Sequence, residues 1–543
     1  MLMGIEIAMR GLYASQRGMA NVSHNVDNTN TPGYSRQVIN QVASRPLLMA
    51  GSAGMLGMGT DVISIDRVRD TFLDEKYWNE SKYMGEWSVK STIIEEMQAV
   101  YNEPSQNGYT KIINDFYSAL QTLSTDPSSE STRALVMEKG KTVAKYFNSV
   151  AKHFDNLQED LNNMVNAKVE EVNHLADQIK ELNLQIYNFE VIGNKANDLR
   201  DRRGYLVDKL SKIVNCNAYE TETGLKLPNG EPEKRFTITI SGKALVDHGN
   251  VVHIKCESRK TNLNSEDIDN LYQISWEDGN KLNVKSGELR GYLDMRDGND
   301  GLNGSPEAKG IPYYMRKMNE FVQTFAMSFN EGIMDSDGDG DLDKTNGHVD
   351  GYTLNGTSKS DLRFFTMLGS DGKPMKSADF KTLLLEYADK MGVPATAPLE
   401  ERMNAGYKCI NARNFSIGFD IENDPTNNIA ASDTAEQVGN NGNLTLLMKM
   451  RHNAYMFREG TPEDFIKTVI SSLGVDGQQY EQYMEVQEGI INQIENRRQS
   501  VSGVSLNEEM TNLVKYQQIY GASAKMVQTF GEVLDILVNR LGI

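Results

Sequence analysis

A run of alternating aspartates is the part of the sequence with the clearest potential for chemistry. The carboxylates stand at every second position, with Gly340 at the sixth place of the run, and they are Asp335, Asp337, Asp339, Asp341 and Asp343. Calcium takes about six to eight oxygen ligands, and calcium loops use this alternation with a glycine at the tight turn. The twelfth place should be a bidentate Glu but is Asn346. We therefore expect either a calcium site closed by another group, such as Asp350, or a solvated acidic loop.

Other reactive residue types form no pattern that specifies an enzyme. The histidines are scattered, with no HExxH or other close metal pair, and Cys216, Cys256 and Cys409 are too widely spaced for a zinc knuckle. Glycines at 51, 54, 57 and 59 lack the ending of a phosphate-binding loop. The sequence therefore favours a protein that is not an enzyme and that requires no cofactor, with calcium as the one candidate ligand.

Composition indicates a large acidic globular protein. The chain has 543 residues, which suggests about three or four domains. Lys and Arg total 56 against 75 Asp and Glu, a formal net charge of -19, so we expect neither nucleic acid nor an anionic membrane as a partner. The first residues do not resemble a cleaved signal peptide. A location outside the cell would therefore require export on a signal that hydropathy does not reveal.

The two ends of the chain share a helical pattern that the middle lacks. Apolar residues follow alternating steps of three and four, which is the seam of a helix that packs on another helix. The first seam is Ile5, Ala8, Leu12, Ser15, Met19, Val22 and Val26, and the second is Leu513, Tyr516, Tyr520, Ser523, Val527, Phe530, Leu534, Leu537 and Leu541. We expect the two helices to pair as a coiled coil and to need neighbouring molecules along part of their length. The alternative is an ordinary amphipathic helix on a domain core.

The middle of the chain predicts a mainly α fold with β structure. No proline occurs between Pro127 and Pro228, and helical spacing there predicts a long helix or antiparallel helices in a bundle. Alternation around Phe236 to Ile240 predicts strands. The expected domains are a terminal coiled coil (1–45 with 505–543), a helical domain (46–214, 286–332 and 437–504), a β-rich domain (215–285) and an inserted outer module of loops and strands (333–436).

The segment Asn21 to Gln37 carries a family resemblance. Its asparagines and threonines compete for backbone hydrogen bonds, and Pro-Gly ends the helix. The signature residues are Asn25, Asn28, Asn30, Thr31, Pro32, Gly33, Tyr34, Ser35 and Arg36. They resemble the N-terminal signature of bacterial flagellar rod, hook and hook-associated proteins, and the Tyr-Ser-Arg-Gln ending is most similar to the hook-associated protein 1 family of hook–filament junction proteins. Segments 197–210, 241–246, 286–294, 311–330 and 502–525 also resemble that family, whereas the loop 335–343 and much of 344–408 match no pattern of it.

The resemblance implies a structural role and a set of partners. A member of this family would form a ring at the hook–filament junction, assembled through its terminal helices, with termini poorly ordered in the free chain. It would be exported by the flagellar type III apparatus without a cleaved signal and lie outside the cell. Its partners would be further copies of itself, the hook protein, a second junction protein (hook-associated protein 3) and an export chaperone. The alternatives are a hook or rod subunit, which would lack the proline-free stretch, and a secreted enzyme or calcium-dependent adhesin acting through 333–436.

Overall fold

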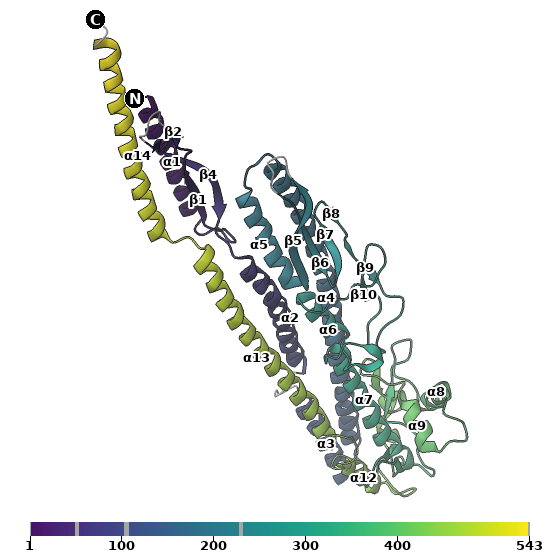
Figure 1. Ribbon diagram of the computed structural model, residues 1–543. Helices are drawn as coiled ribbons and strands as arrows, with labels where there is room; N and C mark the ends of the chain where they lie inside the picture. The colour runs from purple at the N-terminus through teal and green to yellow at the C-terminus, as the bar shows by residue number, and fades with distance from the viewer. Residues whose placement is uncertain (1, 49–53, 102–107, 227–231, 541–543) are drawn as a thin grey trace.

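The protein is an elongated molecule in which the terminal helices α1 and α14 lie together at one tip (Figure 1). The computed structural model describes residues 2–48, 54–101, 108–226 and 232–540. One pair of helices projects from the tip, a layer of long helices forms the middle, and short helices and strand pairs form the opposite end. None of the described helices is both long enough and apolar enough to cross a membrane.

Helices dominate the described residues, and the prediction of a mainly α fold with β structure is confirmed. The long helices are α1 (Leu2–Asp27), α2 (Thr71–Tyr101), α3 (Tyr109–Thr125), α4 (Glu130–Val191), α5 (Asn197–Ile213), α7 (Ile311–Glu331), α13 (Pro462–Ser502) and α14 (Leu506–Asp535), the last continued by a π-helical turn at Ile536–Arg540. The shorter helices are α6 (Glu288–Asp297), α8 (Ser377–Lys390), α9 (Leu399–Tyr407), α10 (Phe419–Asn423), α11 (Pro425–Asn428) and α12 (Gly442–Met450).

The strands form small antiparallel sheets. The largest has the order β5 (Cys216–Lys226), β6 (Pro232–Ile240), β7 (Lys243–Asp247) and β8 (Asn250–Val251). Two-stranded pairs are β1 (Gln37–Ala43) with β4 (Thr60–Arg67), β2 (Leu47–Leu48) with β3 (Met55–Leu56), β9 (Ile254–Ser258) with β10 (Tyr272–Trp276), β11 (Ile333–Met334) with β12 (Asp343–Lys344), and β13 (Phe365–Met367) with β14 (Phe415–Ile417). Strand β6 of the largest sheet buries Phe236, Ile238 and Ile240 in the core that α4 and α5 share, whereas Leu47, Met55 and Leu56 of the β2–β3 pair are exposed.

Helix α4 joins the two hydrophobic cores because its apolar stripe is continuous over 62 residues. Its first half, including Phe147 and Phe154, packs in a core with α2, α3 and α7. Its second half, including Val172 and Ile179, packs in another core with α5 and the strands around Ile238. One continuous helix therefore contributes its apolar face to both hydrophobic cores.

Two segments lie elsewhere than the expected domain division. Residues 333–436 include α8 to α11, and Phe364, Phe365 and Phe415 belong to the same core as Phe116 and Phe329 of the long helices. The ring centroids of Phe116 and Phe365 are 5.8 Å apart. This segment is therefore part of the helical body rather than a separate outer module, because its aromatic residues are buried there. Residues 60–67 were expected in the helical domain, but they form β4, which pairs with β1 and packs beside α1.

Candidate assembly surface

The terminal helices α1 and α14 pack closely because glycines of α1 face larger side chains of α14. Gly4 faces Phe530, Gly11 faces Ser523, and Gly18 faces Tyr516. A Cβ atom added at Gly4 or Gly18 would lie 2.6 Å from the facing ring. Residue numbers rise along α1 as they fall along α14, so the two helices run antiparallel. The spacing of seven residues on both helices keeps these contacts on one line.

Three predicted seam residues, Tyr516, Ser523 and Phe530, make this contact, but few of the predicted residues are buried. Ala8, Ser15 and Val22 are buried; Ile5, Leu12, Met19, Val26, Leu513, Tyr516, Ser523, Val527, Phe530 and Leu534 are half-buried; Tyr520 and Leu537 are exposed. Leu541 lies outside the described residues. Glu509 is the one buried side chain among the described residues of α14. The sequence prediction missed the three glycines, although their seven-residue spacing was visible.

The signature residues after α1 turn the chain back along that helix. The side chain of Asn25 donates to the backbone oxygen of Gln37 at 2.9 Å and accepts from the Gln37 backbone N–H at 3.0 Å. Asn21 donates to the same oxygen at 2.7 Å, and the Tyr34 hydroxyl donates to Asn25 Oδ1 at 2.8 Å. Burial, and then the nearby carboxylates Asp198, Asp201 and Glu509, raise the pKa of Tyr34, so this hydroxyl keeps its proton and its donor role.

The rest of the signature closes the helix end and forms the turn. Asn28 Nδ2 donates to the backbone oxygen of His24 at 2.9 Å, and the Thr31 hydroxyl donates to Asn28 Oδ1 at 3.1 Å. Gly33 has a φ of +79°, and a Cβ added there would lie 2.9 Å from the Cβ of Tyr205 on α5. A glycine is required at that position for both reasons. Asn30 and Pro32 are exposed.

Asp201 on α5 anchors the signature to the body. Its carboxylate accepts from the Ser35 backbone N–H at 2.8 Å and from the Ser35 hydroxyl at 2.9 Å. Arg67 at the end of β4 donates to the same carboxylate at 2.8 Å. The Gln37 side chain donates to Asp198, one turn away on α5, at 2.6 Å. The start of the β1–β4 hairpin, its end and the signature loop are thus all held by one face of α5.

Arg36 binds both sides of the connection between α13 and α14. Its backbone N–H donates to the Ser502 oxygen at 2.8 Å, and its guanidinium pairs with Glu508 at 2.6 Å. Arg498 near the end of α13 pairs with Asp74 of α2 at 3.0 Å and with Asp208 of α5 at 2.9 Å. These bonds fix the place where α14 leaves the body.

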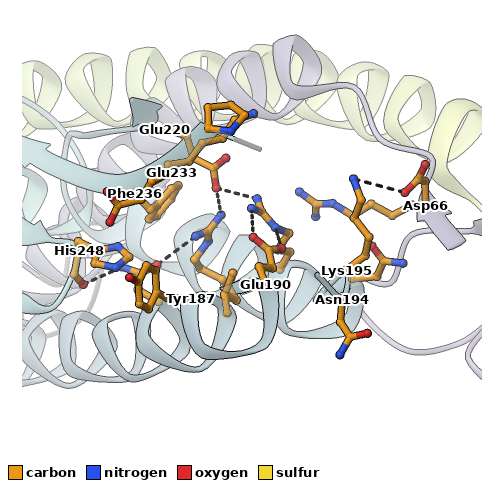
Figure 2. Close-up of a pocket in the computed structure, with 17 residues that line it drawn as sticks. Asp66, Tyr187, Glu190, Asn194, Lys195, Glu220, Glu233, Phe236 and His248 are labelled. Atoms are coloured by element: carbon orange, nitrogen blue, oxygen red, sulfur yellow. Dashed lines mark hydrogen bonds and ion pairs between the residues drawn. The ribbon is translucent and has the colours of Figure 1, made fainter. Parts of the chain in front are cut away.

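A polar cavity of about 480 Å³ lies beside this anchor (Figure 2). Arg200 pairs with Glu190 at 2.7 Å and with Glu220 at 2.7 Å. The Arg203 guanidinium lies 3.8 Å from the centre of the Phe236 ring and also pairs with Glu220. These charges neutralise one another. The ion pairs join α5 to α4 and to the sheet, so we interpret the charged lining of the cavity as structural.

The aspartate loop brings together three of its five carboxylates. Oxygens of Asp335, Asp337 and Asp343 lie within 4.8 Å of one another, whereas Asp339 and Asp341 are outside this group. The backbone N–H groups of Gly338 and Gly340 donate to Asp335, which tightens the turn.

Asp350, the residue considered as a closing ligand, is engaged elsewhere. It pairs with Lys344 and with Lys359, the latter at 3.0 Å. Burial opposes ionisation of Asp350, but the two lysines outweigh it and lower the pKa of its carboxyl. The closing position of the loop is therefore not supplied by Asp350 in this conformation.

Comparisons with known proteins each match this chain to flagellar proteins. Residues 94–345 match the family described as Flagellar hook-associated protein FlgK helical domain, and residues 496–541 match the C-terminal family of flagellar basal body rod FlgEFG proteins. The Flagellar hook-associated protein 1 of Bacillus subtilis is 28% identical, with 100% of this chain and 98% of the relative covered. That of Salmonella typhimurium is 25% identical, with 98% and 99% covered. In fold, the flagellar hook junction protein FlgK from Burkholderia pseudomallei matches with a TM-score of 0.51 and 13% identity, covering 80% of this chain and 100% of that one.

A Gly18→Leu substitution is expected to separate the terminal helices. The added side chain would overlap the Tyr516 ring, which costs about 1–3 kcal/mol when the backbone must shift. Limited proteolysis of the purified chain should release α14 faster from this variant. Arg17→Leu, at an exposed neighbouring position, is the matched control and should cleave like the unmodified chain. Equal cleavage of all three proteins would contradict the glycine contact.

An Asp201→Ala substitution is expected to loosen the terminal region from the body. Removing one partner of a buried, hydrogen-bonded charge pair costs about 3–5 kcal/mol, and Ser35 and Arg67 would both lose their acceptor. Hydrogen exchange at residues 33–37 and 65–67 should accelerate. Arg202→Ala, an exposed neighbour on α5, should leave this exchange unchanged. If both variants exchange like the unmodified chain, Asp201 is not the anchor.

Proposed function

Because the chain belongs to the flagellar hook-associated protein 1 family, a structural family rather than an enzyme family, we propose that it forms the junction between hook and filament of a bacterial flagellum. It would assemble as a ring of copies through α1 and α14. The observation that carries this proposal is the exposure of the terminal helices. Helix α14 is 30 residues long and buries one side chain of its own.

The energetics of α14 favour assembly with other molecules. A helix in a protein gains most of its stability from packing its apolar face against other elements. Ile519, Met526 and Val533 on α14 are 40%, 50% and 38% exposed, and Tyr13 on α1 is 55% exposed. Large apolar surfaces of this kind mark contacts with other proteins. The pair of α1 and α14 therefore leaves apolar surface exposed that contacts with further copies would bury.

The anchor at Asp201 supports a mechanical role. The bonds from Ser35, Arg67 and Gln37 to α5 join the terminal pair to α5, which packs on α4 and α2. A force applied along the terminal helices would pass into the body through these bonds. This arrangement suits a subunit that must connect a flexible hook with a stiffer filament.

The proposal includes partners and a route out of the cell. Its neighbours would be the hook protein on one side and hook-associated protein 3 on the other. Export would use the flagellar type III apparatus and an N-terminal signal that is not cleaved. The exposed apolar rows of α14 would be covered before assembly by an export chaperone. The position of the assembled protein would be extracellular, at the hook–filament junction.

A hook or rod subunit is the alternative function within the same axial proteins. The C-terminal match is to a family of rod proteins, so that end of the chain does not separate the two. The helical body does separate them, because residues 94–345 match a helical domain named for hook-associated protein and contain the 62-residue α4. This observation favours the junction protein.

Calcium at the aspartate loop is a second, independent part of the proposal. Asp335, Asp337 and Asp343 offer three carboxylates, and water or backbone oxygens would have to supply the remaining ligands. Such an ion would stiffen the loop without taking part in a reaction. Calcium titration of the purified chain by calorimetry should give a binding heat that Asp335→Asn removes and Asp341→Asn retains. No binding heat in the unmodified chain would leave the loop as a solvated acidic turn.

A Leu534→Lys substitution is expected to block assembly. Leu534 is half-buried four residues after Phe530, so a lysine there would place a charge on the contact line. In a motile bacterium whose own junction protein is deleted, the unmodified chain should restore filaments and the variant should not. Gln528→Lys, on the far side of α14, is the control and should restore them. Filaments built by the Leu534→Lys protein would contradict assembly through this helix.

A further inference from the structure

The apolar face of α14 is wider than the one helix that covers it. Tyr516, Ser523 and Phe530 form the central row, which faces the glycines of α1. Three residues after each of them stand Ile519, Met526 and Val533, which we call the flank row. A step of three residues turns the helix back by about 60°, so the flank row runs beside the central row along its whole length. Its side chains are 40%, 50% and 38% exposed.

Helix α1 carries a second apolar row on its far side. Met9 and Tyr13 each stand two residues from Gly11, which places them about 160° to 200° around the helix from the side that faces α14. They are 40% and 55% exposed, and Ala20, two residues after Gly18, is exposed as well. We call Met9, Tyr13 and Ala20 the back row. Within one copy the flank row cannot reach the back row, because α1 itself lies between them.

We propose that the flank row of α14 in one copy packs against the back row of α1 in a second copy. This inference rests on the proposed function and identifies which surfaces of the terminal pair meet between neighbours. A second copy is the favoured occupant because the flank row continues the α1–α14 contact without a break. That contact shows that α14 accepts an antiparallel helix at a seven-residue period, and Tyr13 and Ala20 of the back row repeat this spacing.

The geometry of this contact makes it repeatable. Each copy offers one flank row and one back row, and using the flank row leaves the back row of the same copy free for another neighbour. Contacts between two different surfaces of the same chain are heterologous, and their repetition gives a closed ring or an open helix. Every α1 would then be enclosed between its own α14 and the α14 of a neighbour. The assembly would bury the rows that the single chain leaves exposed.

The proposal predicts a specific cross-link between copies. A chain carrying Tyr13→Cys and Met526→Cys is expressed in a motile bacterium whose own junction protein is deleted, and isolated hooks with filaments are oxidised. On a non-reducing gel the monomer band should be lost in favour of a ladder at multiples of the chain mass. The matched control carries Tyr13→Cys with Gln528→Cys, which lies about 140° from the central row. Its protein should stay monomeric, as should the unmodified chain with Cys216, Cys256 and Cys409.

The outcomes separate this inference from the proposed function. A ladder from the Met526 pair alone supports the contact. Filaments that form normally but give no ladder, or equal ladders from both pairs, overturn it and leave the junction function standing. A chain that restores no filaments even when unmodified contradicts the proposed function itself. As a second measurement, Met526→Lys should reduce filament number while the purified chain keeps the helical content and protease pattern of the unmodified protein; unchanged filament number would count against the flank row.

Discussion

The close contact of α14 with the glycines of α1 is the constraint on which the terminal region depends. Gly4, Gly11 and Gly18 let the backbone of α1 approach Phe530, Ser523 and Tyr516. A narrow helix covers only the middle of a wide apolar face, so the same contact that forms the pair also leaves its flanks exposed. The pair is therefore formed within one chain, but its burial is completed only by other molecules. The apolar surface left exposed on α14 is therefore the feature that connects the packing of these two helices with assembly.

The signature after α1 connects that pair to the body through polar bonds rather than apolar packing. Asn25 and Gln37 fix the return of the chain, and Asp201 holds Ser35 and Arg67 against α5. Hydrogen bonds to a buried carboxylate are directional, so they set an orientation that apolar contact alone would leave free. The connection from α1 to β1 and the connection from α13 to α14 lie side by side, because the backbone N–H of Arg36 donates to Ser502 at the end of α13. The signature residues, which in the sequence indicate only the end of a helix, thus connect the terminal helices to the body.

Periodicity predicted the helices and the pairing of the ends, because the apolar spacing of α4 and α14 has a direct cause in one buried face. It did not identify the glycines at the centre of the contact, since glycine carries no hydrophobic signal. Composition, rather than periodicity, led to the separation of residues 333–436 from the body. That segment is rich in Gly, Asp and Asn, but Phe364, Phe365 and Phe415 place it in the common core. The anchor at Asp201 could not be found by spacing, because 166 residues of sequence separate it from Ser35.

Hydrogen exchange of α14 in the free chain and in assembled hooks tests the central claim most directly. The account predicts fast exchange along α14 in the free chain, because one neighbouring helix covers only part of its apolar face, and slow exchange after assembly. The residues of α4 should be protected equally in both states, since their core is complete within one molecule. Equal protection of α14 in both states would mean that the terminal pair is already complete, and the account would be contradicted.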